Sequence, residues 1–231
     1  MEASHIKQVL WGVDVQADFM LPGGKLYVAG AEKIIPNLNR LVDAARKGSA
    51  LLISSTDAHN PDDLEFRDWP PHCLKGNPGA ELIPEARAAP QLVIPNQKDF
   101  LLPHDLGAYQ QIVLEKNTLD VFDNPHTDLL LSRLRSAAAP APDSSLEFLV
   151  FGVVTEFCVR CAAAGLLRRG FRVSLIMDAI KSLDEEKGSE ILRELQSQGA
   201  RLITMEEALA MVGAYSGGTA GTGRQTAASG I

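Results

Sequence analysis

The chain has 231 residues, 45% hydrophobic and 22% charged, which is enough apolar material for one globular domain with a substantial core. Its formal net charge is −7 and no run of Lys or Arg exceeds two residues, so we expect no nucleic-acid partner and no membrane partner. Three cysteines are too few for a disulfide framework, and no segment is typical of a secretory leader or a membrane-spanning helix. We therefore expect a cytoplasmic protein.

Short apolar runs of strand length alternate with amphipathic helical patterns along the chain. Strands are expected at 9–15, 50–55, 112–115, 146–154, 171–177 and 201–204, and helices at 31–47, 128–137, 157–169, 186–198 and 205–212. This alternation predicts a doubly wound α/β domain, with a mostly parallel sheet of about six strands and helices on both faces. Residues 1–213 would form this single domain, and the Gly-, Ser- and Thr-rich residues 214–231 are expected to be a disordered tail.

Two charged side chains lie where predicted strands end. In a doubly wound fold, ligands bind beyond the carboxyl ends of the strands, so these ends are the first place to look for a site. Asp14 lies in an apolar run, where an ionised and unpaired carboxylate would cost several kcal/mol. Lys116, at the end of another strand, is a candidate cation for it. The pair could form part of a site or an ordinary structural ion pair.

Cys158 stands where an apolar strand gives way to a helix that Thr155 is expected to cap. Unpaired backbone N–H groups at a helix start lower the pKa of a thiol, and a nearby lysine would add to the effect. A carboxylate could take the proton, so Asp14, Lys116 and Cys158 together would make an activated nucleophile. Cysteine is also often buried as a small hydrophobe, and Cys158 with Cys161 forms a Cys-x-x-Cys pair typical of redox centres.

The segment 56–73 contains four side chains that can bind a metal, namely Asp57, His59, Glu65 and His72. Asp57 and His59 are two residues apart where a strand pattern ends, so an extended backbone would point both to the same face. Two imidazoles with one or two carboxylates suit zinc, iron or manganese. Because Asp, Asn and Pro also crowd ordinary turns, the segment by itself leaves metal binding open.

Four motifs, taken in this order, resemble the isochorismatase-like cysteine hydrolases and, within them, the nicotinamidases. The motifs are Asp14-Val-Gln-Ala-Asp-Phe19, Asp57-Ala-His59 with Trp69-Pro-Pro-His72-Cys73, Glu115-Lys116, and Gly152-Val-Val-Thr-Glu-Phe-Cys158-Val159. The resemblance spans about residues 8–212. It implies an isochorismatase-like fold and amide hydrolysis, with Asp14 as general base, Lys116 as the cation that stabilises thiolate and intermediate, and Cys158 as nucleophile.

The same resemblance implies how the oxyanion and the metal would be held. The oxyanion donors would be the backbone N–H groups of Val154 and Cys158, next to a cis peptide bond between Val153 and Val154. One divalent metal per chain, zinc before iron or manganese, would be bound by Asp57, His59 and His72, with Glu65 standing where some members supply a fourth ligand. No organic cofactor is implied.

Aromatic residues complete the site that the resemblance implies. In nicotinamidases, aromatics matching Phe19 and Trp69 hold the substrate ring, and we add Phe157 as a third substrate-binding residue. Each aromatic could instead cover the core beneath a loop. The chain departs from the family at Asn117-Thr-Leu-Asp-Val-Phe-Asp-Asn-Pro125, where nicotinamidases carry a Tyr-Ser-x-Phe-like stretch that lines the pocket. Amide hydrolysis is therefore better supported than the identity of the amide.

Three hypotheses follow from these patterns. The leading one is a metal-dependent cysteine amidohydrolase, a homo-oligomer that converts nicotinamide to nicotinate and ammonia in NAD salvage through a Cys158 thioester. The second keeps the triad but changes the small-molecule substrate to another amide, a ureido compound or an enol ether. The third, from a different class, is a thiol redox module or a non-catalytic metal-binding module.

Overall fold

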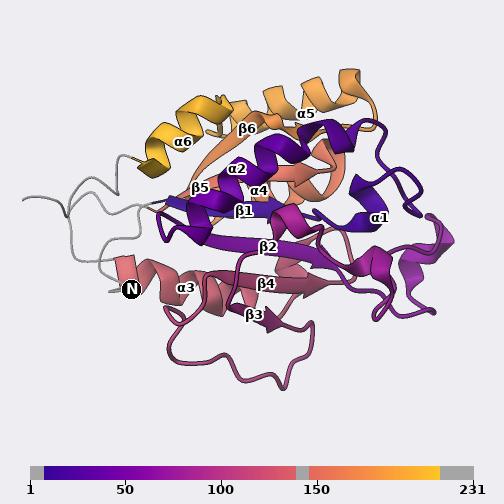
Figure 1. The fold of residues 1–231 in the computed structure, drawn as a ribbon, viewed down its shortest axis with the longest axis horizontal. Coiled ribbons are helices and arrows are strands. Elements are labelled where there is room, and N and C mark those ends of the chain that lie inside the picture. Colours follow the sequence, from indigo (N-terminus) through magenta and orange to yellow (C-terminus); the bar gives the residue numbers. More distant parts are fainter. Residues whose placement is uncertain (1–7, 139–145, 214–231) are drawn as a thin grey trace, which may run out of the picture.

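The computed structural model describes residues 8–138 and 146–213, so the tail expected at 214–231 lies outside the described part. Seven parallel strands form one sheet in the order β3-β4-β2-β1-β5-β6-β7, with helices on both of its faces (Figure 1). The predicted doubly wound α/β class is confirmed. The sheet has seven strands where about six were expected.

The strands follow the apolar runs of the sequence closely. They are β1 (Gln8–Val13), β2 (Leu51–Asp57), β3 (Gln91–Ile94), β4 (Gln111–Lys116), β5 (Glu147–Val153), β6 (Arg172–Lys181) and β7 (Arg201–Ile203). The unexpected strand is β3, which has only four residues and lies at the edge of the sheet beside β4. Its side chains alternate between exposed and buried, and so short a run gives too weak a signal to be separated from a loop.

Helices lie on both faces of the sheet. They are α1 (Ala17–Met20), α2 (Ile35–Arg46), α3 (Thr127–Ala138), α4 (Arg160–Arg168), α5 (Glu185–Ser197) and α6 (Met205–Gly213). The apolar faces of α2 and α6 pack into one core cluster, and those of α3, α4 and α5 pack into another on the opposite face of the sheet. β1 supplies both clusters, with Trp11 facing one and Leu10 facing the other. None of the helices in these ranges has the length and apolarity needed to cross a bilayer.

The central strands bring polar residues together at their carboxyl ends. β1 lies between β2 and β5, so the chain runs outward from β1 in one direction through β2 and returns to its other side at β5. In this parallel register, Asp57 at the end of β2 lies opposite Lys116 at the end of β4. Asp14 follows β1, and its backbone N–H donates to the carbonyl of Ser55 over 2.9 Å. In a parallel sheet whose strand order reverses in this way, the ligand crevice lies beyond the carboxyl ends of the strands, at the point of reversal.

The connection from β5 to α4 carries Cys158. It begins with the cis peptide bond between Val153 and Val154 that the family resemblance implies, and continues as a π-helical turn, Thr155–Val159. The expected cap by Thr155 is wrong, because Thr155 lies inside the turn and Val154 occupies the cap position. The Thr155 hydroxyl is buried and has no hydrogen-bond partner within the described ranges.

Gly152 should tolerate no side chain. Its φ is +114°, and a Cβ would lie 2.1 Å from the carbonyl oxygen of Val13 on the neighbouring strand. We expect Gly152→Ala to lower the free energy of unfolding by roughly 2–4 kcal/mol, because backbone strain adds to the overlap. Urea denaturation would measure the change.

The matched control is Gly170→Ala. Gly170 also has a positive φ, +74°, but its Cβ would meet open space. This control should therefore lose only the backbone contribution of about 1 kcal/mol. Equal losses in the two variants would contradict the close approach of β1 and β5.

Candidate active site

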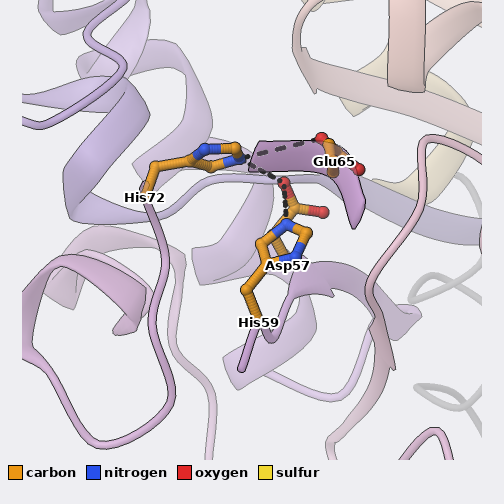
Figure 2. Close-up of side chains that lie close together, drawn as sticks. All are labelled: Asp57, His59, Glu65 and His72. Atoms are coloured by element: carbon orange, nitrogen blue, oxygen red, sulfur yellow. Dashed lines mark hydrogen bonds and ion pairs between the residues drawn. The ribbon is translucent and has the colours of Figure 1, made fainter. Parts of the chain in front are cut away.

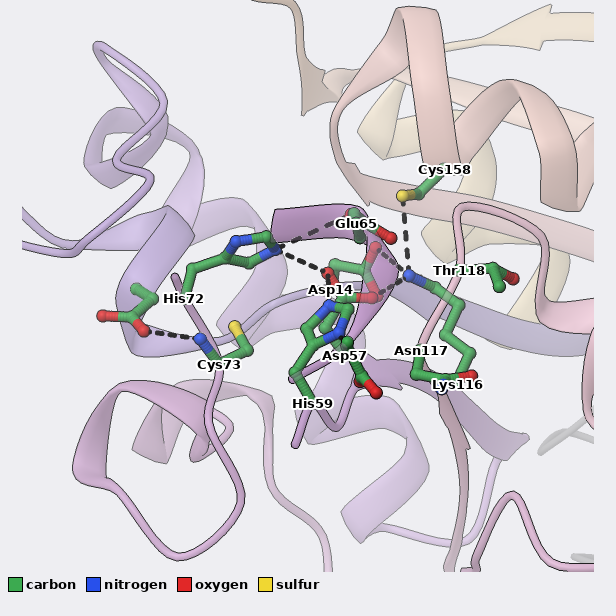
Figure 3. A network of polar contacts seen from close by, with 12 residues as sticks. Asp14, Asp57, His59, Glu65, His72, Cys73, Lys116, Asn117, Thr118 and Cys158 are labelled. Carbon is green, nitrogen blue, oxygen red and sulfur yellow. Dashed lines mark hydrogen bonds and ion pairs between the residues drawn. The ribbon is translucent and has the colours of Figure 1, made fainter. Parts of the chain in front are cut away.

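Lys116 lies at the centre of the charged side chains that gather at the carboxyl ends of the strands (Figure 3). Its Nζ is 3.0 Å from Asp14 Oδ2 and 3.5 Å from Cys158 Sγ, and it forms a direct ion pair with Asp57 Oδ1. All four residues are buried. The structure thus brings together the three residues selected from strand ends, and it adds Asp57, which the sequence suggested only as a metal ligand.

The charges of this group depend on one another. Burial raises the pKa of Asp14 to about 7, against the opposing effect of the Lys116 ammonium. Burial would lower the pKa of Lys116, but the carboxylates of Asp14 and Asp57 raise it well above its usual value. Lys116 therefore stays a cation, while Asp14 can both accept and release a proton near neutral pH, which suits a general base.

The Cys158 thiol is not activated in the way that the sequence suggested. Burial raises its pKa well above the usual value, and the neighbouring carboxylates of Asp14 and Asp57 add to this, so the attraction of Lys116 does not compensate. The expectation of a lowered pKa at a helix start is wrong here, because a thiol only 7% exposed loses more by desolvation than Lys116 returns. The proton of Cys158 must therefore pass to a base.

Four side chains lie close enough together to hold one metal ion, and this group of side chains is called the metal cluster below (Figure 2). One ligand atom from each of Asp57, His59, Glu65 and His72 lies within 4.8 Å of all the others. Asp57 Oδ2 is 3.3 Å from His72 Nε2 and 3.7 Å from His59 Nε2, and Glu65 Oε1 is 3.9 Å from His72 Nε2. The set predicted from the sequence, including its fourth member, meets at one point.

The chemistry of these groups fits a divalent cation. Among residues 8–138 and 146–213, the buried His59 Nε2 has no hydrogen-bond partner, and a buried polar atom left unpaired is costly. Burial and the nearby Asp57 raise the pKa of Glu65, as expected for carboxylates gathered without a cation between them. Two imidazoles and two carboxylates match the ligands of zinc, and also those of iron or manganese.

Two polar side chains of the first motif, to which the sequence suggested no role, hold the metal-binding segment. The Gln16 amide donates to the carbonyls of Asp57 and Ala80 over 2.7 Å each, and its oxygen accepts the Asp57 N–H over 2.7 Å. Asp18 accepts the backbone N–H of Cys73, next to His72, over 2.7 Å. Their polar character within an apolar stretch was visible, but the partners named here lie 41 to 64 positions away in sequence.

A small, largely apolar cavity adjoins both Cys158 and the metal cluster. Its wall contains Phe19, Leu26, Val28, Asp57, Glu65, Trp69, His72, Leu119, Val154, Phe157, Cys158 and Leu183. The three aromatics expected to bind substrate are all present, and the rings of Trp69 and Phe157 meet edge to face with centroids 5.4 Å apart. Cys161 is not part of this wall, so the Cys-x-x-Cys pair does not share it.

Comparison with known proteins identifies the family. The isochorismatase domain model matches residues 9–100 and 93–207. The chain belongs to the isochorismatase family. It is 23% identical over 217 residues to the nicotinamidase of Escherichia coli, a match that covers 84% of this chain and 93% of that one. It is 26% identical over 199 residues to the nicotinamidase/pyrazinamidase of Mycobacterium tuberculosis, covering 83% and 95%.

A solved structure extends the likeness to three dimensions. The pyrazinamidase of Pyrococcus horikoshii, crystallised in complex with zinc, superposes with a TM-score of 0.66 at 27% identity, covering 86% of this chain and 99% of that one. The family, the likeness to nicotinamidases and the class of enzyme, a hydrolase of an amide C–N bond, are thus confirmed. The triad and the metal-cluster residues all fall within the matched ranges.

Removing the charge of Lys116 should destabilise the fold. In Lys116→Met, Asp14 and Asp57 would remain buried without their cation, and we expect the free energy of unfolding to fall by about 3–5 kcal/mol. Urea denaturation in the presence of a chelator would measure this without a contribution from bound metal.

Lys75→Met is the matched control for that measurement. Lys75 forms a partly exposed ion pair with Glu115 over 3.1 Å, so its loss should cost about 1 kcal/mol or less. A Lys116 variant no less stable than this control would contradict the assignment of Lys116 as the charge that holds the two carboxylates together.

Proposed function

We propose that the chain is a metal-dependent cysteine amidohydrolase that converts nicotinamide and water to nicotinate and ammonia. The observation that carries the proposal is the contact of Lys116 with Asp14, Asp57 and Cys158, because it joins a nucleophile, a base and a metal cluster beside one cavity. The curated nicotinamidases that match most of the chain support the choice of substrate.

The first half of the reaction forms a thioester. Asp14 takes the proton of the Cys158 thiol, and the sulfur attacks the carboxamide carbon. The backbone N–H groups of Val154 and Cys158 would bind the resulting oxyanion. Asp14 then gives its proton to the amide nitrogen, the C–N bond breaks and ammonia leaves. Lys116 stays protonated throughout and stabilises the negative charge as it moves between sulfur and carboxylate.

The second half returns the enzyme to its starting state. Asp14 takes a proton from water, and the hydroxide that forms attacks the thioester carbon. The C–S bond breaks, the proton on Asp14 returns to the sulfur of Cys158, and nicotinic acid leaves and gives its carboxyl proton to the solvent as nicotinate. Because the pKa of Asp14 is raised to about 7, the same carboxyl group can serve as base and acid in turn.

Side chains of the cavity wall would orient the substrate. Phe19, Trp69 and Phe157 would hold a flat ring so that its carboxamide faces Cys158, and fixing this geometry can contribute several kcal/mol. Asp57, His59, Glu65 and His72 would hold the divalent metal, zinc before iron or manganese. When bound, the metal would offer a Lewis-acidic partner to the nitrogen of a pyridine ring.

A second substrate class is favoured by one observation. Leu119, from the segment that departs from the nicotinamidase pattern, lies in the cavity wall. An apolar side chain there changes what the pocket can recognise without touching the triad, so another amide or a ureido compound could replace nicotinamide. A panel of carboxamides and ureido compounds, assayed for ammonia release, would separate the two candidates.

Loss of the nucleophile is the direct test of the activity. We expect wild-type protein to release ammonia from nicotinamide, and Cys158→Ala to lower kcat/KM by roughly 10⁴-fold or more, the scale reached when a nucleophile is removed. Cys161→Ala is the control and should stay within about threefold of wild type, because Cys161 lies outside the cavity wall. Full activity of Cys158→Ala, or intact nicotinamide with wild-type enzyme, would refute the proposal.

Metal removal is a separate test. We expect about one zinc per chain by elemental analysis, and roughly a tenfold or greater loss of nicotinamide turnover after chelation, recovered on adding zinc. His72→Ala, which removes one ligand, should not recover. Undiminished turnover by metal-free protein would show that the cluster is not needed for this reaction.

A further inference from the structure

The two histidines of the metal cluster differ in what their second ring nitrogen contacts. His72 Nδ1 lies 2.8 Å from the carbonyl oxygen of Pro70, a neutral acceptor. His59 Nδ1 lies 3.0 Å from the carboxylate Oδ2 of Asp63. Since a carbonyl and an ionised carboxylate only accept hydrogen bonds, a neutral ring at either position carries its proton on Nδ1 and leaves the lone pair of Nε2 to the cluster. Of the two histidines, only His59 has a charged group as the partner of its Nδ1.

Asp63 is held in place for this contact. Its Oδ2 also accepts the backbone N–H of Asn60 over 3.0 Å, and its own N–H donates to the Asn60 carbonyl over 3.2 Å. The backbone of His59 is fixed as well, because its N–H donates to the carbonyl of Cys73 over 3.1 Å and its carbonyl accepts the N–H of Lys75 over 3.0 Å. The carboxylate side chain is 13% exposed and the imidazole is fully buried.

We propose that Asp63 is a positioning residue that sets the tautomer and the orientation of His59 and thereby strengthens binding of the divalent metal. The inference rests on the metal site of the proposed function. Asp63 is not itself one of the clustered ligands. A carboxylate that accepts from the far nitrogen of a ligating histidine fixes the ring and raises its basicity, and removing such a partner weakens metal binding by about 10–100-fold.

A competing explanation is that negative charge near the site attracts the cation at long range. Asp63 lies in a broad surface hollow that also contains Asp62, Asp68, Asp120 and Asp123. Long-range attraction would depend on the number of carboxylates and would weaken with salt, whereas a hydrogen bond to His59 belongs to Asp63 alone. Asp62 separates the two explanations, because it is adjacent, exposed and equally charged, and makes no hydrogen bond or ion pair within residues 8–138 and 146–213.

The test compares zinc affinity of three variants, measured by competition with a chromophoric chelator. Asp63→Ala should bind zinc about 10–100-fold more weakly than wild type. Asp63→Asn keeps an oxygen that can accept from His59 but loses the charge, so its loss should be smaller, under about tenfold. Asp62→Ala, the matched control, should stay within about twofold. Thermal unfolding of the metal-free proteins would check that Asp63→Ala remains folded.

A second measurement reports the tautomer directly. In ¹⁵N spectra of metal-free protein at a pH where the ring is neutral, His59 of the wild type should show a protonated Nδ1 and an unprotonated Nε2. Asp63→Ala should move His59 toward the other tautomer and leave His72 unchanged. A merely structural role for Asp63 would not produce this selective change.

The outcomes separate this inference from the proposed function. Wild-type zinc affinity in Asp63→Ala, or an equal loss in Asp62→Ala, overturns the inference and leaves the nicotinamidase proposal standing. Weaker zinc binding confined to the Asp63 variants, in a protein that leaves nicotinamide intact, supports the inference and refutes the substrate. Wild-type protein that binds no zinc overturns the metal site and the role of Asp63 together.

Discussion

The ion pairs of buried Lys116 with Asp14 and Asp57 are the interaction on which the site depends. Two carboxylates at this depth could not both ionise without a cation, because desolvation costs several kcal/mol for each charge. With Lys116 between them they adopt different states: Asp57 keeps a pKa below its usual range, whereas the pKa of Asp14 rises to about 7. One carboxylate is thus suited to bind a metal and the other to transfer protons.

The parallel sheet explains why these groups meet. The carboxyl ends of β1, β2 and β4 lie at the same end of the sheet, and the register places Asp57 opposite Lys116. The first motif then connects the two halves of the site, since Asp14 contacts Lys116 while Gln16 binds the backbone of Asp57 on both sides. A short stretch after β1 therefore positions both the proposed base and a proposed metal ligand.

The cavity wall explains how this framework could serve different substrates. Cys158 and the metal cluster form one side, and aromatic and aliphatic side chains from separate loops form the rest. Leu119 and Leu183 contact neither Lys116 nor the metal ligands through any described hydrogen bond or ion pair. Changes at such residues would alter the shape of the pocket while the charged groups of the proposed triad stay in place, which is why the class of reaction is better determined than the amide.

The sequence by itself determined the doubly wound fold, the family, and which residues gather as triad and metal cluster, because apolar periodicity and motif spacing are local signals. It did not reveal the edge strand β3, the support from Gln16, Asp18 and Asp63, or the part of the cavity wall formed by Leu183, whose contacts depend on distant loops. Nor did it give the protonation of Cys158. A helix start favours the thiolate, but burial beside two carboxylates opposes it more strongly, and only the tertiary structure determines that balance.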